Sequence, residues 1–368
     1  MKSISPGQKR FAEIFNLEGL QNRMDLPRLT IVLPAHNAEL TIAAAIQSML
    51  SQSYPNFELW ILESGSSDRT AEVARAFTDP RVKVFELGSM SFQNVLGFAL
   101  NNAQTEWLAR MDSDDLSFPD RLRKQVEVIA AQPDLVLVGT RFVYLTPFGH
   151  IVETRPGAVS RDIGPLNLRL LGNDARFFAD ASVVYRRSVA LEVGGYDPEF
   201  PMSDVPLWFR MLSVGKGFEI AQPLYLYRLH PNSMRYTNVA PSDELYRFLV
   251  KYAPDLLHLH FPEGAFQPKP VSWHLQYYWL TVAIYEILAG DREAVLQAVH
   301  SLDREGPVGR EARLIRWFNL LGPLGTTFYR WYGRNKYRHR PDWERLFSDR
   351  YGSLVIDTRA FPARDSNA

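Results

Sequence analysis

Three carboxylates stand close together in residues 112–115, which read Asp-Ser-Asp-Asp and follow an apolar stretch. If the chain stays extended here, the side chains of Asp112 and Asp114 point to the same side of the backbone. Two carboxylates so placed suit a hard divalent cation, and a diphosphate can approach them only when a cation lies between. The alternative is a helix start, in which Asp115 and Ser117 cap the helix that follows.

A second polar turn spans residues 63–68 and reads Glu-Ser-Gly-Ser-Ser-Asp. Its acid, Glu63, stands where an apolar stretch ends, and a carboxylate there could accept hydrogen bonds from a ribose or a base edge. Gly65 would let a ligand come close to the backbone. The alternative is that Ser67 or Asp68 only caps the next helix.

An acid and an imidazole further along the chain are also candidates for chemistry. Asp204 lies next to the apolar side chains of Trp208 and Phe209. A carboxylate in such surroundings is a candidate general base, because desolvation raises the pKa of an acid. The alternative is that Asp204 caps a helix over residues 205–214. His230 could ligate a metal or donate to a phosphate, and a structural role is its alternative.

Short apolar runs alternate with helical patterns in the first part of the chain. The predicted strands are residues 29–33, 57–62, 81–85, 107–111 and 135–138, and the predicted helices are residues 39–51, 70–77, 92–104 and 121–131. Strands that alternate with helices indicate right-handed crossovers and a mainly parallel sheet, hence an α/β fold. Ligands gather at the carboxyl ends of such strands, and both acidic clusters follow predicted strands.

Composition excludes several classes of partner and site. The chain has 368 residues, with 41 Lys plus Arg balanced by 41 Asp plus Glu, which argues against a nucleic-acid partner held by an overall positive field. It has no Cys, so any metal must sit on oxygen or imidazole ligands. We find no apolar stretch of signal-peptide length at the start and none long enough to span a bilayer. We therefore expect a cytoplasmic protein.

The C-terminal third has a different, helical character. Two apolar stripes predict a helical hairpin: Trp273, Tyr277, Leu280, Ile284 and Leu288, then Ala294, Val295, Ala298, Val299 and Leu302. Residues 317–340 join an uncharged, aromatic-rich run to five positive side chains, Arg330, Arg334, Lys336, Arg338 and Arg340. This pattern suits peripheral contact with an anionic membrane surface. The alternative is that the run packs on the rest of the protein with its arginines in solvent.

Taken together, six segments of the chain resemble the family 2 glycosyltransferases. They are residues 31–38, 63–68, 109–115, 194–197, 204–210 and 227–233. The resemblance covers about residues 28–235 and implies the GT-A fold, a Rossmann-like, mainly parallel sheet flanked by helices. We therefore expect an N-terminal extension over residues 1–27, a GT-A glycosyltransferase domain over 28–238 and an α-helical region over 239–368.

The resemblance also implies roles for single residues. Those matched to nucleotide binding are Pro34, Ala35, Asn37, Glu63, Ser64, Arg110 and Asp112; those matched to a Mn²⁺ or Mg²⁺ site are Asp112, Asp114 and His230. Asp204 matches the carboxylate that deprotonates the acceptor hydroxyl. The implied reaction is an inverting transfer from a nucleotide-diphospho-sugar, for which we expect a UDP-sugar, to a glycan or lipid-linked acceptor. On family analogy it serves surface polysaccharide or glycolipid synthesis, at the inner face of the cell membrane.

Three positions depart from the family pattern. Glu63 stands where Asp is usual, Ser203 precedes Asp204 where the family has an acidic pair, and Asp180-Ala181-Ser182 replaces a segment that begins with His in many relatives. Two other functions stay open. A nucleotidyltransferase would need a Gly-rich loop with Arg or Lys after the first strand, which residues 34–37 lack. A non-catalytic nucleotide-sugar-binding module is the other alternative, and Ser203 keeps it open.

Overall fold

The computed structural model describes residues 26–153, 160–163, 179–200, 204–233, 241–252, 254, 271–289 and 291–304. Most of the expected N-terminal extension, Ser203 and the expected membrane-facing run over 317–340 lie outside the described residues.

One sheet of ten strands forms the centre of the described chain. The strands are β1 (Leu29–Ala35), β2 (Phe57–Glu63), β3 (Val82–Glu86), β4 (Trp107–Arg110), β5 (Leu116–Ser117), β6 (Leu135–Leu145), β7 (Ile151–Val152), β8 (Arg161–Ile163), β9 (Val184–Arg186) and β10 (Lys216–Arg228). Their order is β3-β2-β1-β4-β9-β6-β10-β5, with β7 beside β6 and β8 beside β10. Strands β3, β2, β1 and β4 run parallel, as do β6 and β10, while β9 is antiparallel to both its neighbours. The α/β prediction with a mainly parallel sheet is confirmed.

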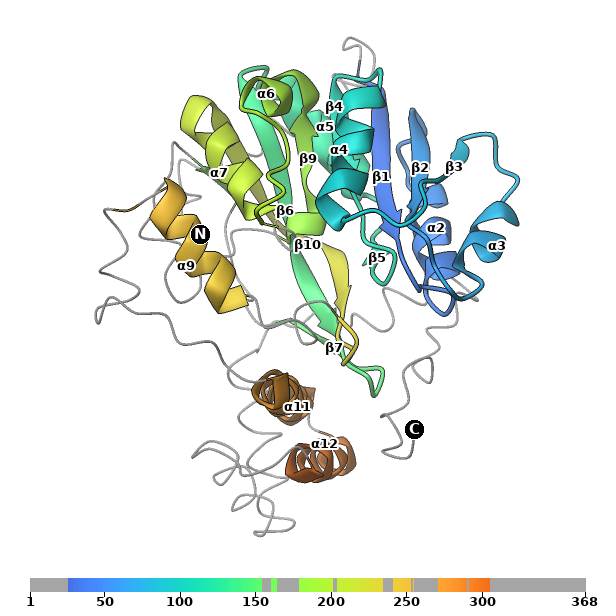
Figure 1. Ribbon diagram of the computed structural model, residues 1–368, viewed down its shortest axis with the longest axis vertical. Coiled ribbons are helices and arrows are strands. Elements are labelled where there is room, and N and C mark those ends of the chain that lie inside the picture. The colour runs from blue at the N-terminus through green and yellow to red at the C-terminus, as the bar shows by residue number, and fades with distance from the viewer. Residues whose placement is uncertain are drawn as a thin grey trace, which may run out of the picture.

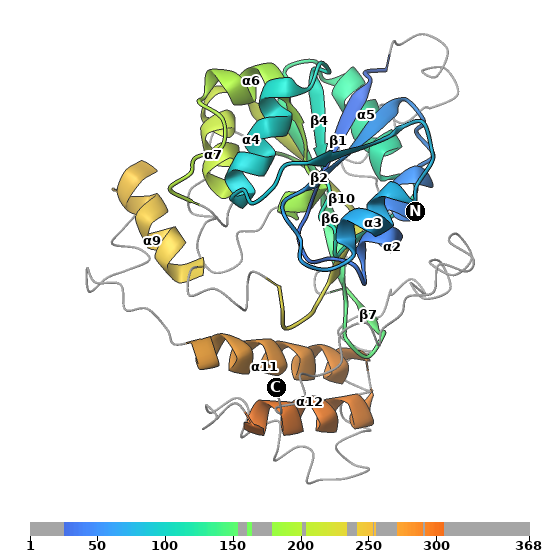
Figure 2. The ribbon, with the colours of Figure 1, turned by 45° about the vertical axis from the view of Figure 1, so that its right-hand side comes forward.

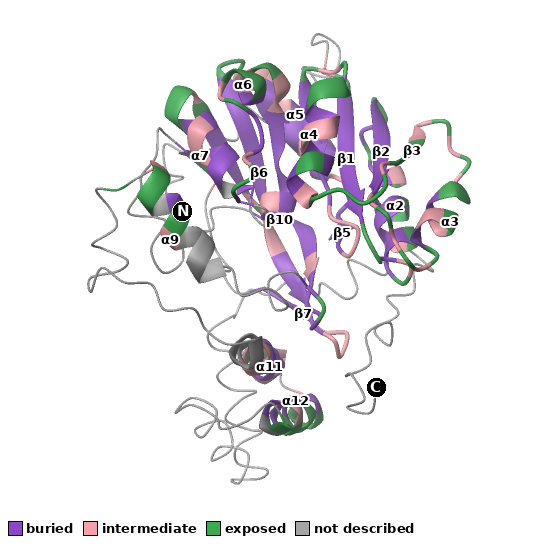
Figure 3. Ribbon diagram, viewed as in Figure 1, coloured by how far each residue is buried: buried purple, intermediate pink, exposed green. Residues whose placement is uncertain are grey.

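Helices cover both faces of this sheet, as Figures 1 and 2 show. They are α2 (Ile42–Leu50), α3 (Thr70–Arg75), α4 (Phe92–Asn102), α5 (Arg121–Ala131), α6 (Arg187–Glu192) and α7 (Val205–Val214), with a 3₁₀ turn at Asp180–Ser182. Successive side chains of β1 enter different cores: Ile31 packs in the cluster of α2 and α5, and Val32 in that of α4, α6 and α7. Because alternate side chains of a strand point to opposite faces, each central strand is buried on both sides (Figure 3).

Three described helices follow the sheet: α9 (Pro241–Tyr252), α11 (Val271–Ala289) and α12 (Arg292–Arg304). The predicted hairpin is α11 and α12, and the whole predicted stripe of α12 is buried. Of the predicted stripe of α11, Leu280 packs on the buried cluster and Ile284 is 40% exposed, while Tyr278, Val282 and Ala283, outside the stripe, are buried. The side chains of Trp273, Tyr277 and Leu288 lie outside those that the structure describes. Apolar residues of α11 are distributed all around the helix, so their spacing alone does not predict which face is buried.

The helical pair packs on one end of the sheet. Tyr144 of β6 and Leu229, just after β10, share a buried cluster with α11 and α12. Figures 1 and 2 show β6 and β10 running from the sheet towards these helices. Among the described residues, no helix has the length and apolarity needed to cross a membrane.

Candidate functional site

The loops after β1 and β2 lie side by side because the two strands end in register, with Ala35 opposite Glu63. Asn37 joins them: its backbone amide donates to Ser66 Oγ (3.0 Å), and its Oδ1 accepts from the Ser67 amide (2.9 Å). Asn37 has φ 49°, a left-handed conformation that Asn adopts more readily than most residues. Pro34, at the end of β1, leads into this loop pair.

Glu63 and its neighbours form a tight turn over this loop pair. The buried Glu63 carboxylate accepts a hydrogen bond from the Ser66 amide, and the Ser64 amide donates to Ala35 O (3.0 Å). Gly65 has φ 74°, and a Cβ there would lie 3.0 Å from the backbone nitrogen of Ser89. Asp68 contacts the start of α3, where its Oδ1 accepts from the Thr70 amide (3.0 Å), although the N-cap position itself is Arg69.

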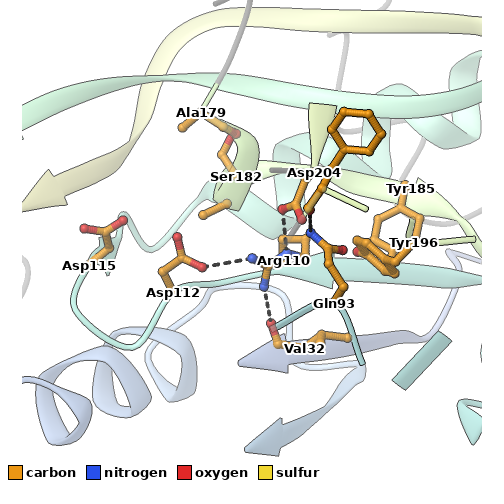
Figure 4. Close-up of polar contacts among 12 residues, drawn as sticks. Val32, Gln93, Arg110, Asp112, Asp115, Ala179, Ser182, Tyr185, Tyr196 and Asp204 are labelled. Carbon is orange, nitrogen blue, oxygen red and sulfur yellow. Dashed lines mark hydrogen bonds and ion pairs between the residues drawn. The ribbon is translucent and has the colours of Figure 1, made fainter. Parts of the chain in front are cut away.

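Arg110 is the centre of the site (Figure 4). Its side chain is 1% exposed, donating from Nε to Asp204 Oδ2 (3.1 Å) and from Nη2 to Asp112 Oδ1 (3.0 Å). Its Nη1 donates to Val32 O of β1 (3.4 Å). Burial alone would lower the pKa of Arg110, but Asp204 and then Asp112 reverse this and raise it. One buried guanidinium therefore holds the predicted general base and a predicted metal ligand together.

The acidic run forms a loop between β4 and β5, in which Asp112, Asp114 and Asp115 have carboxylate oxygens within 4.8 Å of one another. Asp115 is buried, and both its oxygens accept protein hydrogen bonds: from Tyr225 OH and from the Arg228 amide, each at 2.8 Å. The interpretation of Asp115 as a helix cap is therefore wrong. Asp112 uses Oδ1 for Arg110 and Asp114 uses Oδ2 for His230, so each has a second oxygen to offer a cation.

Charge crowding shows in the pKa values of this loop. Burial raises the pKa of Asp112 to about 7, opposed by Arg110 and helped by Asp114. Burial, Asp114 and Asp112 also raise the pKa of Asp115. Burial would raise the pKa of Asp114 too, but the hydrogen bond from His230 lowers it. The oxygen donors and the repulsion among them fit a hard divalent cation such as Mg²⁺ or Mn²⁺.

His230 reaches the acidic loop from the end of β10. Its Nε2 lies 2.9 Å from Asp114 Oδ2, and the side chain is 6% exposed. Arg228, two residues earlier, donates from Nε to Asp114 O (2.9 Å). The structure thus brings His230 to the predicted metal cluster, although a long stretch of chain separates them.

Asp204 precedes α7 but makes no side-chain cap to it, so its interpretation as a capping side chain is wrong. The side chain is 3% exposed and turns to Arg110 through Oδ2. Among the described residues, its Oδ1 has no hydrogen-bond partner. A buried, unsatisfied carboxylate oxygen is costly, and such groups are concentrated where chemistry needs them.

Several supporting residues carried no signal in the sequence pattern. Arg121 at the start of α5 is buried and donates from Nη1 to Arg110 O (3.0 Å) and Ala181 O (3.1 Å). Gln93 of α4 donates from Nε2 to Phe200 O (2.7 Å), in the segment that leads to Asp204. Arg or Gln near a helix start usually lies at the surface, so only their partners identify them.

The chain is similar to known proteins over this same region. The family model that matches, over residues 30–194, is described as glycosyl transferase family 2. The O-antigen biosynthesis glycosyltransferase WbnJ of Escherichia coli is 28% identical over 226 residues, which are 58% of this chain and 85% of WbnJ. The E. coli UDP-Glc:α-D-GlcNAc-diphosphoundecaprenol β-1,3-glucosyltransferase WfgD is 34% identical over 110 residues, 29% of this chain and 42% of WfgD.

Solved structures agree on the fold. The crystal structure of S. aureus TarS 1–349 in complex with UDP-GlcNAc superposes with a TM-score of 0.50 and 16% identity, over 84% of this chain and 89% of that one. At this identity the likeness concerns the fold alone. With the sheet order and the loops at its strand ends, these matches show that residues 30–194 are similar to glycosyl transferase family 2 and that the fold is the GT-A fold.

Proposed function

We propose that the protein catalyses an inverting transfer of a sugar from a nucleotide-diphospho-sugar to an acceptor hydroxyl. The observation that carries this proposal is the buried Asp204 carboxylate, with Oδ1 unpaired among the described residues and Oδ2 joined through Arg110 to Asp112. One guanidinium, that of Arg110, holds both the proposed base Asp204 and Asp112, the carboxylate proposed to face the diphosphate through a cation. This arrangement suits a direct displacement. The acceptor oxygen then bonds to the anomeric carbon from the side opposite the nucleoside diphosphate, whose bond to that carbon breaks in the same step.

In this reaction Asp204 accepts the proton of the acceptor hydroxyl at Oδ1 while Arg110 keeps the carboxylate oriented through Oδ2. The loop pair of Asn37 and Ser64 would receive the nucleotide, with Pro34, Ala35 and Glu63 forming its walls. Asp112, Asp114 and His230 would hold the divalent cation. When bound, Mn²⁺ or Mg²⁺ supplies positive charge that stabilises the departing nucleoside diphosphate.

We further propose a UDP-sugar donor and a glycan or lipid-linked acceptor in surface polysaccharide or glycolipid synthesis. Support comes from WfgD, whose name gives UDP-Glc as donor and a diphosphoundecaprenol-linked sugar as acceptor, and from WbnJ of O-antigen biosynthesis. Such acceptors lie at membranes, so the proposed peripheral contact through residues 317–340 stays a prediction. A liposome flotation assay tests it, since a chain ended near Ile315 should lose binding that the full chain retains.

The direct test is nucleoside diphosphate release from a panel of nucleotide sugars with Mn²⁺ or Mg²⁺, with and without candidate acceptors. We expect metal-dependent release of UDP, and a loss of about 10²–10⁴-fold in turnover for Asp204→Asn with donor binding retained. Asp112→Ala should lose metal dependence as well. The matched control is Asp134→Asn. Asp134 is an exposed aspartate that pairs with Lys216, far from the site.

Other outcomes of this assay would favour one of the two alternative functions or refute the role of Asp204. Pyrophosphate production from a nucleotide and a sugar phosphate would favour the nucleotidyltransferase. Donor binding without turnover with any acceptor would favour the binding module. Full turnover by Asp204→Asn would refute the assignment of the base.

A further inference from the structure

Tyr225 of β10 contacts the acidic loop at two points. Its hydroxyl donates to Asp115 Oδ2 (2.8 Å) and accepts from the backbone amide of Asp112 (3.3 Å). The side chain is fully buried, and the guanidinium of Arg121 lies over its ring, 5.5 Å from the centroid. Burial and the charge of Asp115 raise the pKa of Tyr225 well above its usual value, so the hydroxyl stays protonated and can donate.

Arg228 on the same strand makes two more contacts with this loop. Its backbone amide donates to Asp115 Oδ1 (2.8 Å), and its Nε donates to Asp114 O (2.9 Å). Both oxygens of Asp115 are thus used within the protein. Asp112 and Asp114 are each about a third exposed. The loop therefore divides into one buried anchoring carboxylate and two carboxylates that can meet a ligand.

Such anchoring matters because the three carboxylates repel one another. Like charges within a few ångströms favour a loop that opens, and a cation then has to bring the ligands back together at an energetic cost. A loop fixed beforehand avoids that cost. The contacts from β10 hold the backbone on both sides of Ser113, at the amide of Asp112 and the carbonyl of Asp114.

We propose that Tyr225 is a positioning residue that, through Asp115 and the Asp112 amide, preorganises Asp112 and Asp114 for a divalent cation. This inference rests on the proposed function, because it takes these two aspartates as the metal ligands. It adds a role that neither the acidic pattern nor the family resemblance assigned to Tyr225. It also makes Asp115 an anchor of the loop and not one of the ligands.

The test uses the full chain and Mn²⁺ alone, without donor or acceptor. Free Mn²⁺ is followed by electron paramagnetic resonance in wild type, Tyr225→Phe and Tyr54→Phe. Tyr54 is the matched control, a buried tyrosine whose hydroxyl donates to Pro27 O (2.6 Å) away from the acidic loop. We expect Tyr225→Phe to raise the Kd for Mn²⁺ about tenfold, the effect of one hydrogen bond to a charged group. Tyr54→Phe should leave the Kd within twofold of wild type.

A second readout separates positioning from general loss of stability. Backbone amides of residues 112–116 should exchange hydrogen faster in Tyr225→Phe, while amides of β1 and β2 keep their wild-type rates. Asp115→Asn should also weaken Mn²⁺ binding. The double variant with Tyr225→Phe should lose less binding free energy than the sum of the two single variants, because both changes act on the same Tyr225–Asp115 hydrogen bond.

The outcomes distinguish this inference from the proposed function. If wild type binds no Mn²⁺ at millimolar concentration, the metal assignment itself fails. If wild type binds Mn²⁺ and Tyr225→Phe matches Tyr54→Phe, the metal site stands and the positioning role is refuted. If Asp115→Asn abolishes binding while Tyr225→Phe has no effect, Asp115 is a ligand and not an anchor.

Discussion

Replacing Arg110 by Met should destabilise the protein far more than the loss of an ordinary ion pair. Arg110 is 1% exposed and Asp204 is 3% exposed, so Arg110→Met leaves a carboxylate buried without its cation. Removing one partner of a buried ion pair costs about 3–5 kcal/mol, because the remaining charge stays desolvated. Asp112 is 32% exposed and can turn to water, so we assign the loss mainly to Asp204.

The chain provides its own control for this experiment. Arg75 and Glu86 form an ion pair with side chains 56% and 51% exposed, and Arg75→Met should cost less than about 1 kcal/mol. Urea unfolding followed by tryptophan fluorescence gives the free energies of unfolding. Adding Asp204→Asn to Arg110→Met removes the stranded charge and should recover about 2 kcal/mol or more. The reasoning is refuted if Arg110→Met costs no more than Arg75→Met, or if the double variant recovers nothing.

Two further predictions concern the loops of the site. Gly65→Ala should lower stability by about 1–3 kcal/mol and weaken nucleotide binding, because φ 74° and the nearby Ser89 backbone both oppose a Cβ. The control is Gly97→Ala in α4: a Cβ there meets nothing within 4 Å, so this change should stabilise the protein by up to about 1 kcal/mol in thermal unfolding. The pKa of Asp112 is raised to about 7, so the metal-free fold favours the protonated carboxyl and loses stability as pH rises through 7. The rise in Tm that Mn²⁺ produces should therefore be larger at pH 8 than at pH 6; an equal rise at both would contradict the assignment of Asp112 as a ligand.

The sequence predicted those features that depend on residues close together in the chain. Buried parallel strands leave apolar runs such as residues 29–33 and 107–111, and both are close to the observed β1 and β4. The acidic residues at the end of β2 and after β4 could be placed at one edge of the sheet, since the carboxyl ends of parallel strands meet at the same edge. The same reasoning brings Glu63 to the loop of Asn37.

Interactions between distant residues were beyond such reasoning. A local pattern offered Asp204 the role of a general base or of a helix cap but not its partner Arg110, which lies 94 residues earlier in the chain. Asp115 looked like a cap for the same reason, although Tyr225 is 110 residues away. The antiparallel β9 between β4 and β6 was also missed, because an apolar stretch does not specify which strand it will pair with.

The packing of α11 and α12 on the end of β10 links the sequence of the helical region to that of the acidic loop. Leu229 lies in the same buried cluster as Val282 and Val299, and the next residue along the chain is His230. A mutation in either valine would disturb the neighbour of His230, a proposed metal ligand, without touching any substrate. Acceptable substitutions in these helices are therefore restricted to those that preserve their packing on Leu229 at the end of β10.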